Sequence, residues 1–374
     1  MDNKSNVFEL GKLLEYEQPS KYIVESTDYN DSYLTPVLTA GKTFVLGYTN
    51  EQDGIYDNLP VIIFDDFTTA SRYVNFPFKV KSSAMKILKP NLDLVDPKYI
   101  YYRMQIINID HSTHKRYWIQ QYSKIKISIP TLPEQKRIVA RIEELFSNLD
   151  SAVETLQKTK QQLEVYRQAV LREAFADYDT EVCLNEVCRH ITDGDHMPPP
   201  KAEKGIPFIM ISNIQNNIIN WDNTAYVGED YFSKINEKRT PKKGDVLYTV
   251  TGSFGIPVII DFEKPFCFQR HIALLRPNDR ILQKYLFYVL QSPQVYQQAK
   301  DKSTGTAQKT VGLNVLRKIE IPFVDNKSLQ NDIVTALESK LTICDSIKQT
   351  IDQSLQQAEA MRQSILKQAF EGEL

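Results

Sequence analysis

The sequence lacks the patterns that mark secreted, disulfide-linked and membrane proteins. Its four cysteines (Cys183, Cys188, Cys267 and Cys344) form no C-x-x-C pair, which is typical of a chain in a reducing cytoplasm. No apolar run approaches the ~20 residues of a membrane span, and the polar start Met1–Ser5 does not resemble a signal peptide. We therefore expect a cytoplasmic protein without a membrane partner.

An excess of positive charge is also missing. The 374 residues contain 45 Lys and Arg against 47 Asp and Glu, so the formal net charge is −2. A chain with this balance shows no overall attraction to nucleic acid. Any DNA-binding surface must therefore be local and must be balanced by acidic residues elsewhere.

Signatures of catalysis and metal binding are absent too. The segment Gly305–Thr310 lacks the second glycine of a phosphate-binding loop, and no glycine-rich turn after a strand offers a seat for S-adenosylmethionine. Asp193–His196 is more typical of a turn than of a metal site, and Cys183, Cys188 and His190 do not have zinc-ligand spacing. We expect no catalytic residue, bound cofactor or metal on this chain.

The chain does contain an internal repeat. Residues 134–175 align without a gap on residues 329–370, and 15 of the 42 positions are identical. The resemblance continues upstream, where Lys98–Tyr102 matches Lys284–Tyr288. The offset drifts from 186 to 195 residues, as it does when loops differ between two copies of one unit.

Both repeated segments have the heptad pattern of a coiled-coil helix. Apolar residues alternate at spacings of three and four, which predicts one helix over 133–177 and another over 326–374. Thr131 with Glu134 predicts a capping box for the first helix, and Asn326 or Ser328 predicts a cap for the second. The predicted seam comprises Ile138, Ile142, Leu145, Leu149, Leu156 and Leu163 in the first helix, and Ile333, Leu337, Ile347, Ile351, Met361 and Ile365 in the second.

Pairing of these helices would determine the architecture. Two equivalent units in one chain tend to associate about an approximate two-fold axis, which makes the helices antiparallel. The alternative is that each helix packs only on its own globular domain. We expect an α+β fold, with two globular mixed α/β domains in a pseudo-two-fold arrangement, over 1–132 and 178–325, joined by two long antiparallel coiled-coil helices.

The globular segments contain several short predicted strands and helices. Each segment is expected to carry a helix, around Lys98–Ile107 in the first and Leu282–Lys300 in the second. The predicted strands are Val61–Phe64, Met85–Leu88, Pro207–Ile211, Asp245–Val250, Pro257–Ile260 and His271–Leu275.

At this point a family resemblance can be stated. The chain resembles the specificity subunit of type I restriction–modification enzymes over nearly its whole length, and the repeated order of variable domain and helix is the specific part. The supporting motifs are Gly205–Ile209, Lys242–Leu247, Gly305–Lys309, Lys318–Pro322 and Ile129–Gln135.

The resemblance implies a function and a set of partners. It implies two target recognition domains, each reading half of a bipartite site on double-stranded DNA. It further implies two methyltransferase subunits docked on the helices, with S-adenosylmethionine bound by those subunits. A motor–nuclease subunit is a further partner that the family allows.

The loop before the last strand of each domain is the first candidate for DNA contact, because hydroxyls, amides and cations suit phosphates and base edges. A second group lies near the predicted strands of both halves. For any one of these residues a solvated turn is the alternative. The candidates are Thr304, Thr306, Gln308, Lys309, Lys242, Lys243, Ser253, Gln269, Arg270, Thr113, His114, Lys115, Arg116 and Arg72.

Two other classes of function remain open at this point. One is a coiled-coil scaffold that joins proteins without binding DNA. The other is an enzyme with a duplicated α/β core, which would show a repeated pair of titratable residues.

Overall fold

A computed structural model describes residues 6–41, 43–109, 116–178, 180–306 and 308–374. The chain divides into two compact units. Unit 1 comprises Met1–Leu156 and Gln353–Leu374, and unit 2 comprises Gln157–Asp352. Each unit therefore contains one globular domain and part of both long helices. Within the described ranges, no helix combines the length and apolar character needed to cross a membrane.

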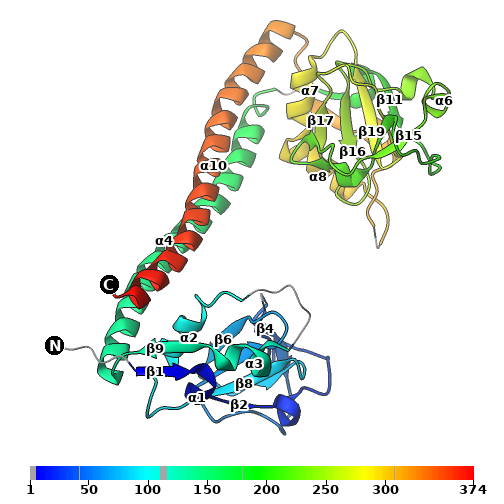
Figure 1. Cartoon of the computed structure of the whole chain (residues 1–374). Coiled ribbons are helices and arrows are strands. Elements are labelled where there is room, and N and C mark those ends of the chain that lie inside the picture. Colours follow the sequence, from blue (N-terminus) through cyan, green and yellow to red (C-terminus); the bar gives the residue numbers. More distant parts are fainter. Residues whose placement is uncertain (1–5, 42, 110–115, 179, 307) are drawn as a thin grey trace. The chain divides into compact units, whose positions relative to one another are not determined.

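The two long helices are α4 (Leu132–Glu173) and α10 (Lys327–Glu371), with 42 and 45 residues. They run antiparallel. In unit 2, Lys160 pairs with Asp352 at 2.6 Å, and Glu173 near the end of α4 meets Lys340 at 4.0 Å. The same direction holds in unit 1, where Arg362 of α10 pairs with Asp150 of α4. Figure 1 shows the two helices side by side.

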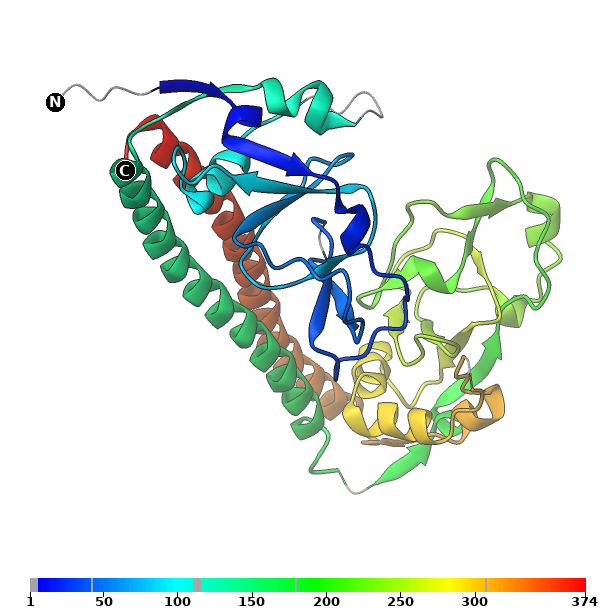
Figure 2. The same cartoon turned by 90° about the horizontal axis from the view of Figure 1, so that it is seen from below.

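The start of α4 and the end of the chain meet in unit 1. The Arg137 guanidinium lies 3.5 Å from the Leu374 carbonyl oxygen, and Figure 2 shows the C-terminus beside the first turn of α4. The Glu134 carboxylate accepts hydrogen bonds from Arg137 rather than completing a capping box with Thr131. At α10, Asn326 is the cap, because its Oδ1 accepts the N–H groups of Ser328 and Leu329.

The helix seam differs from the prediction at two positions. Ile347 and Met361 are 41% and 52% exposed, so they lie outside the seam, whereas Ile142, Ile333, Leu337, Ile351 and Ile365 are buried. The three-four spacing instead continues through Lys348 and Arg362, which pair with Glu164 and Asp150 of α4. Long cationic side chains bury their stems and keep their charge at the edge of the seam, so Lys348 and Arg362 can occupy positions where the apolar pattern predicts Ile347 and Met361.

Each domain is built around a four-stranded antiparallel sheet. In unit 1 the strand order is β2-β8-β5-β6, with bounds Leu14–Glu17, Met85–Pro90, Val61–Asp65 and Ser71–Val74. In unit 2 the order is β11-β19-β16-β17, with bounds Cys188–Asp193, Ile272–Pro277, Val246–Thr249 and Pro257–Ile259.

Smaller sheets complete both domains. Unit 1 has β4-β3-β7 (Val45–Thr49, Thr35–Leu38, Lys79–Val80) and β1-β9 (Asn6–Glu9, Lys126–Ile129). Unit 2 has β15-β12-β18 (Ala225–Val227, Ile206–Ile209, Cys267–Phe268), β10-β20 (Glu181–Cys183, Glu320–Pro322) and β13-β14 (Ile214–Gln215, Ile218–Ile219).

Each domain also contains several short helices. Those of unit 1 are α1 (Leu10–Leu13), α2 (Pro97–Met104) and α3 (Tyr117–Gln120). Those of unit 2 are α5 (Leu184–Val187), α6 (Glu229–Phe232), α7 (Gln283–Leu290), α8 (Pro293–Asp301) and α9 (Leu313–Arg317). The single helix expected over 282–300 is thus two helices, because Pro293 lacks an N–H group and begins a new one.

Candidate nucleic-acid interface

Several loops of unit 2 leave its four-stranded sheet at the same edge. Thr249, the last residue of β16, lies opposite Ile272, the first residue of β19. Asp193, the last residue of β11, lies opposite Ala273. The loops after β16 and β11 and the loop before β19 therefore emerge together. We call residues 193–196, 250–255, 269–271, 304–306 and 308–310 the unit-2 loop edge.

A hairpin closed by Thr304 and Thr310 is tied to the loop after β16. Thr304 and Thr310 exchange backbone hydrogen bonds of 2.9 and 2.8 Å, and the Gly252 N–H donates to the Lys309 carbonyl at 2.9 Å. Gly305 has a φ of +105°, and a Cβ there would lie 2.3 Å from the Gln308 carbonyl oxygen. Only glycine fits this position, so the hairpin shape depends on it.

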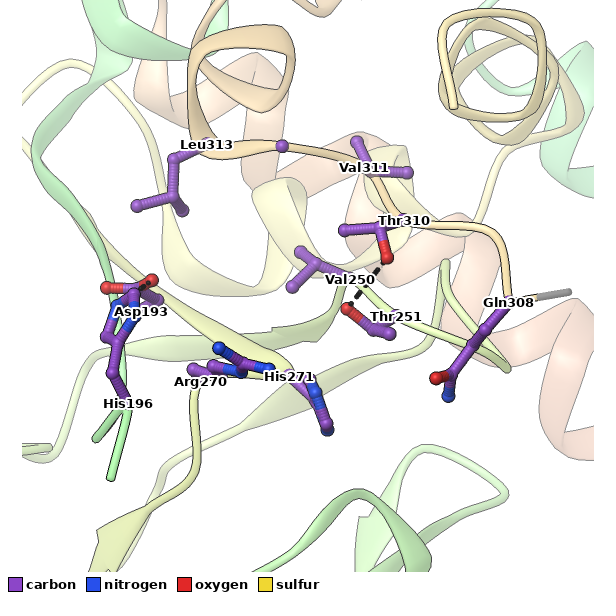
Figure 3. A pocket seen from close by; sticks show the side chains of 11 residues that line it. Asp193, His196, Val250, Thr251, Arg270, His271, Gln308, Thr310, Val311 and Leu313 are labelled. Atoms are coloured by element: carbon purple, nitrogen blue, oxygen red, sulfur yellow. Dashed lines mark hydrogen bonds and ion pairs between the residues drawn. The ribbon is translucent and has the colours of Figure 1, made fainter. Parts of the chain in front are cut away.

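A pocket of about 320 Å³ opens within this edge. Figure 3 shows Arg270 and His271 on one side of it and Val311 and Leu313 on the other. The Thr310 and Thr251 hydroxyls lie 3.4 Å apart at its wall. The remaining lining residues are Asp193, His196, Val250, Gln308 and Gly312.

The carboxylates of this edge have partners inside the domain. Asp193 lies 2.8 Å from His196 Nε2 and 3.4 Å from the Arg239 guanidinium, and Asp195 accepts a 2.8 Å hydrogen bond from the Tyr231 hydroxyl. These contacts reduce the repulsion that free carboxylates would exert on a phosphate backbone.

Arg270 and His271 offer different recognition chemistry. The Arg270 guanidinium is exposed and makes no hydrogen bond or ion pair within the described part of the chain. Burial, followed by the nearby Arg270, lowers the pKa of His271. The edge thus presents a free cation with five donors beside a neutral imidazole, both of which suit base edges.

The structure brings together some of the predicted contact residues. Arg270 and Gln308 line the pocket, and Ser253, Gln269, Thr304, Thr306 and Lys309 belong to the same loop edge. Lys242 and Lys243 do not, because they precede β16 and lie at its opposite end. The Lys242 ammonium is also held 2.6 Å from Glu237. This pair of lysines is therefore separate from the loop edge.

Unit 1 has the corresponding edge. We call residues 65–70, 82–84 and 116–118 the unit-1 loop edge. Arg116 is exposed there. Arg72 is half-buried in β6, where it donates to the Gly41 carbonyl at 3.3 Å and lies over the Phe44 ring. Thr113, His114 and Lys115 lie outside the described residues.

Asp193 and His196 are pocket residues that the sequence-based prediction missed. The Asp-Gly-Asp-His run is predicted to form a turn, but Asp193 ends β11 and Asp195 forms an isolated bridge with Gln269. The pairing of β11 with β19 brings this run beside Arg270. Strand pairing over about 80 residues leaves no local signal, so the composition of the turn alone could not reveal its neighbours. Within the described ranges, no group of three or more His, Cys, Asp or Glu side chains is placed to hold a metal ion.

The long helices hold each domain through the same set of contacts. Buried Gln135 of α4 accepts the Asp96 N–H at 2.8 Å and donates to the Leu94 and Pro130 carbonyls at 3.1 and 2.9 Å. In unit 2, Gln330 of α10 accepts the Leu282 N–H at 2.7 Å and donates to the Arg280 and Val324 carbonyls at 2.9 and 2.7 Å. We call these two sets of contacts the helix sockets.

Aromatic and charged contacts complete the sockets. Tyr99 meets Phe370 of α10 edge to face with ring centroids 5.2 Å apart, and Tyr285 meets Phe175 in the same way at 5.4 Å. Lys98 pairs with Glu143, and Lys284 pairs with Glu338 at 2.7 Å. Each domain is thus held by the first part of one long helix and by the end of the other.

The sequence matches known DNA specificity proteins. The type I restriction modification DNA specificity domain matches residues 3–165 and again residues 179–357. The specificity subunit of the type I restriction enzyme EcoR124I/EcoR124II of Escherichia coli is 32% identical over 371 residues, which cover 93% of this chain and 89% of that protein. The MjaVIII specificity subunit of Methanocaldococcus jannaschii is 22% identical, with coverages of 85% and 81%.

Solved structures show the same fold. A chain from a study of complex assembly and conformational transition of the type I R-M system superposes with a TM-score of 0.73 at 18% identity, covering 99% of this chain and 98% of that one. The HsdS subunit from Thermoanaerobacter tengcongensis superposes with a TM-score of 0.52 at 18% identity, with coverages of 99% and 97%.

The chain matches one DNA specificity domain family twice and resembles its relatives over nearly the whole length. These matches favour DNA recognition over a scaffold that does not bind DNA. The chain belongs to the type I restriction modification DNA specificity family, and it is a sequence-specific DNA-binding specificity subunit with two recognition domains.

Proposed function

We propose that the chain reads a bipartite DNA site, with the unit-1 loop edge on one half-site and the unit-2 loop edge on the other. The observation that carries this proposal is the convergence of the unit-2 loops around Arg270, Gln308 and a pocket of about 320 Å³. A free guanidinium beside hydroxyl and amide side chains is the chemistry that reads base edges in a DNA groove. The equivalent loop edge of unit 1 would read the second half-site.

Arg270 is the main candidate for base readout in unit 2. A guanidinium that makes two parallel hydrogen bonds to guanine is the commonest specific contact in protein–DNA complexes. Gln308 suits adenine in the same way, while Thr304, Thr306 and Lys309 suit phosphates. Lys242 and Lys243 lie apart from this edge and have no part in the proposed readout.

The chain is proposed to be non-catalytic and to dock two methyltransferase subunits on its helix pair. These subunits would bind S-adenosylmethionine and carry out the methylation, and a motor–nuclease subunit would join through them. Support comes from exposed apolar side chains on the helices. Tyr166, Ile343, Ile347 and Met361 are 53%, 59%, 41% and 52% exposed.

The repeat suggests why two such subunits would bind. Met361 occupies the repeat position of Tyr166, so both copies place an exposed apolar side chain at the same point of the helix. Ile343 and Ile347 are four residues apart and therefore share a face of α10. Exposed apolar residues at equivalent positions are suited to two copies of one partner.

The test begins with a complex of this chain and its methyltransferase subunits. Mapping methylated bases in a genome exposed to the complex should give one motif with two read segments and an unread gap. Fluorescence anisotropy of a labelled duplex that carries this motif should show tight binding by the complex. The chain alone should bind weakly, since few free cations are clustered on either loop edge. A motif without a gap, or equal affinity of the chain alone at moderate salt, would contradict the proposal.

A further inference from the structure

Unit 1 contains a buried ion pair directly beneath its loop edge. Asp66 follows β5 and Lys86 lies in β8, and each side chain is only 1% exposed. Asp66 Oδ2 lies 3.6 Å from Lys86 Nζ, which also donates to Gln18 Oε1 at 2.8 Å. Burial lowers the pKa of Lys86, and the Asp66 carboxylate acts in the opposite direction. Burying two charges is costly, so the pair calls for a specific role.

Asp66 contacts each of the segments that form the unit-1 loop edge. Its N–H donates to the Ala84 carbonyl at 3.1 Å, and its carbonyl accepts the Tyr117 N–H at 2.9 Å. Its carboxylate oxygen Oδ1 accepts the Trp118 N–H at 2.8 Å. One residue thus joins the loop after β5, the loop before β8 and the residues that follow Arg116.

Unit 2 repeats the two backbone hydrogen bonds that Asp66 makes in unit 1, but without a charged pair. We call these two bonds the backbone frame. The Val250 N–H donates to the His271 carbonyl at 2.9 Å, and the Val250 carbonyl accepts the Val311 N–H at 2.8 Å. The strand registers place Val250 at the position of Asp66 and Ala273 at that of Lys86. The frame therefore forms with an apolar pair, so the ion pair of unit 1 is not required for the frame as such.

We infer that Asp66 and Lys86 are positioning residues for DNA reading by unit 1. Recognition of the half-site read by unit 1 depends on them, and recognition of the other half-site does not. This inference rests on the proposed function. What the charges add to the shared frame is the bond from Trp118 to the Asp66 carboxylate and the bond from Lys86 to Gln18. Both bonds fix segments next to the unit-1 loop edge. A displacement of these segments would change which DNA bases the loops can reach.

The test replaces the pair by its unit-2 counterpart. The double variant Asp66→Val with Lys86→Ala removes both charges together, so no charge is left buried without a partner. In complex with the methyltransferase subunits, we expect methylation of sites with one altered base in the unit-1 half-site to rise about tenfold, the discrimination supplied by one base contact. The unit-2 half-site and the gap should be unchanged.

A second double variant separates positioning from packing. Asp66→Asn with Lys86→Met also removes the charges, but the amide oxygen still accepts the Trp118 N–H. We expect this variant to relax the unit-1 half-site less than the Val/Ala variant, because it keeps the bond from Trp118 and loses only the bond from Lys86 to Gln18. An unchanged motif in both variants, or equal loss at both half-sites, would overturn the inference. Failure of both variants to assemble would overturn it as well, because the pair would then be needed for folding itself.

A third variant distinguishes this inference from the proposed function. Arg116→Ala removes an exposed cation of the unit-1 loop edge and leaves both residues of the buried pair in place. If Arg116→Ala alters the unit-1 half-site and the Val/Ala variant does not, the positioning role is wrong and the proposed reading edge stands. If neither variant alters the motif, the assignment of DNA reading to this edge fails.

Discussion

The guanidinium of Arg167 on α4 lies 2.8 Å from the carboxylate of Asp345 on α10. The repeat offset of 195 residues converts this pair into Arg362 and Asp150, which also form an ion pair, in unit 1. Arginine and aspartate have exchanged helices between the two pairs. This exchange is what a two-fold relation between the helices produces, and it is seen here from contacts inside each unit.

Other identical positions of the repeat are explained in the same way. Gln135 and Gln330, Glu143 and Glu338, and Phe175 and Phe370 are pairs of identical residues that make the socket contacts in units 1 and 2. The constant part of the sequence is therefore the part that holds the domains to the helices. The variable part contains the loop edges.

Replacing Arg270 and Gln308 by alanine should relax one half-site. Each lost base contact is expected to cost about 1–3 kcal/mol of discrimination at its position. Methylome sequencing of the variant complex should show loss of preference in one read segment, with the other segment and the gap unchanged.

Lys243→Ala is the matched control for this prediction. Lys243 is an exposed cation of the same domain, but it lies at the far end of β16. Its replacement should leave the base preferences unchanged. Equal effects of the Lys243 and Arg270 variants would mean that the loop edge has no special role in readout.

Lengthening both helices by one heptad should widen the unread gap. The insertions belong between Thr155 and Leu156 in α4 and between Gln356 and Gln357 in α10, so that the Lys160–Asp352 and Asp150–Arg362 pairs can both form. Seven residues add about 10 Å, or roughly three base pairs of B-DNA. Three base pairs also rotate the second half-site by roughly 100°, so methylation of the longer motif should be slower.

Insertion into α4 alone is the control. With α10 unchanged, only one of the two sets of ion pairs can keep its partners, so assembly should be impaired. If the variant with both insertions methylates the original spacing at the original rate, the helices do not set the distance between the half-sites.

Gln135→Leu should destabilise unit 1 selectively. The change leaves the Asp96 N–H and the Leu94 and Pro130 carbonyls without their partner, at about 1–3 kcal/mol for each buried group. Hydrogen exchange should show faster opening of unit 1, and Gln330→Leu should give the same result in unit 2. Equal loss of protection in both units from either change would argue against independent sockets.

Ile347→Glu should weaken methyltransferase assembly without unfolding the chain. The side chain is exposed on α10, so its replacement removes no core contact. If Ile347 is one of the few residues that dominate the binding energy of the interface, placing a charge there should lower the affinity by about tenfold or more. Binding can be measured by titrating the methyltransferase against the variant, with circular dichroism to confirm helix content. Gln161→Glu, on the exposed surface of α4, should bind normally, and a similar loss there would indicate an effect of charge alone.

Some of these features could be predicted from the sequence, and the physical reasons are local. The heptads over α4 and α10 depend on residues three and four apart, and the strands β5 and β16 are short apolar runs. The pattern does not predict Lys348 and Arg362 as seam residues, because their apolar neighbours Ile347 and Met361 fit the same spacing. Asp193 lies near Arg270, and Asp66 near Lys86, because strands that are distant in the sequence pair with each other. A local sequence pattern does not reveal such pairing.

The two helix sockets make the recognition domains interchangeable in principle. A domain that presents a lysine and two tyrosines in the pattern of Lys98, Tyr99 and Tyr102, which recurs as Lys284, Tyr285 and Tyr288, meets the same glutamine, glutamate and phenylalanine at either position. Recombination within the repeated helices could therefore exchange one domain for another in a single step. A lineage of such proteins could acquire new target sequences by shuffling whole domains, while the surfaces that hold them stay the same.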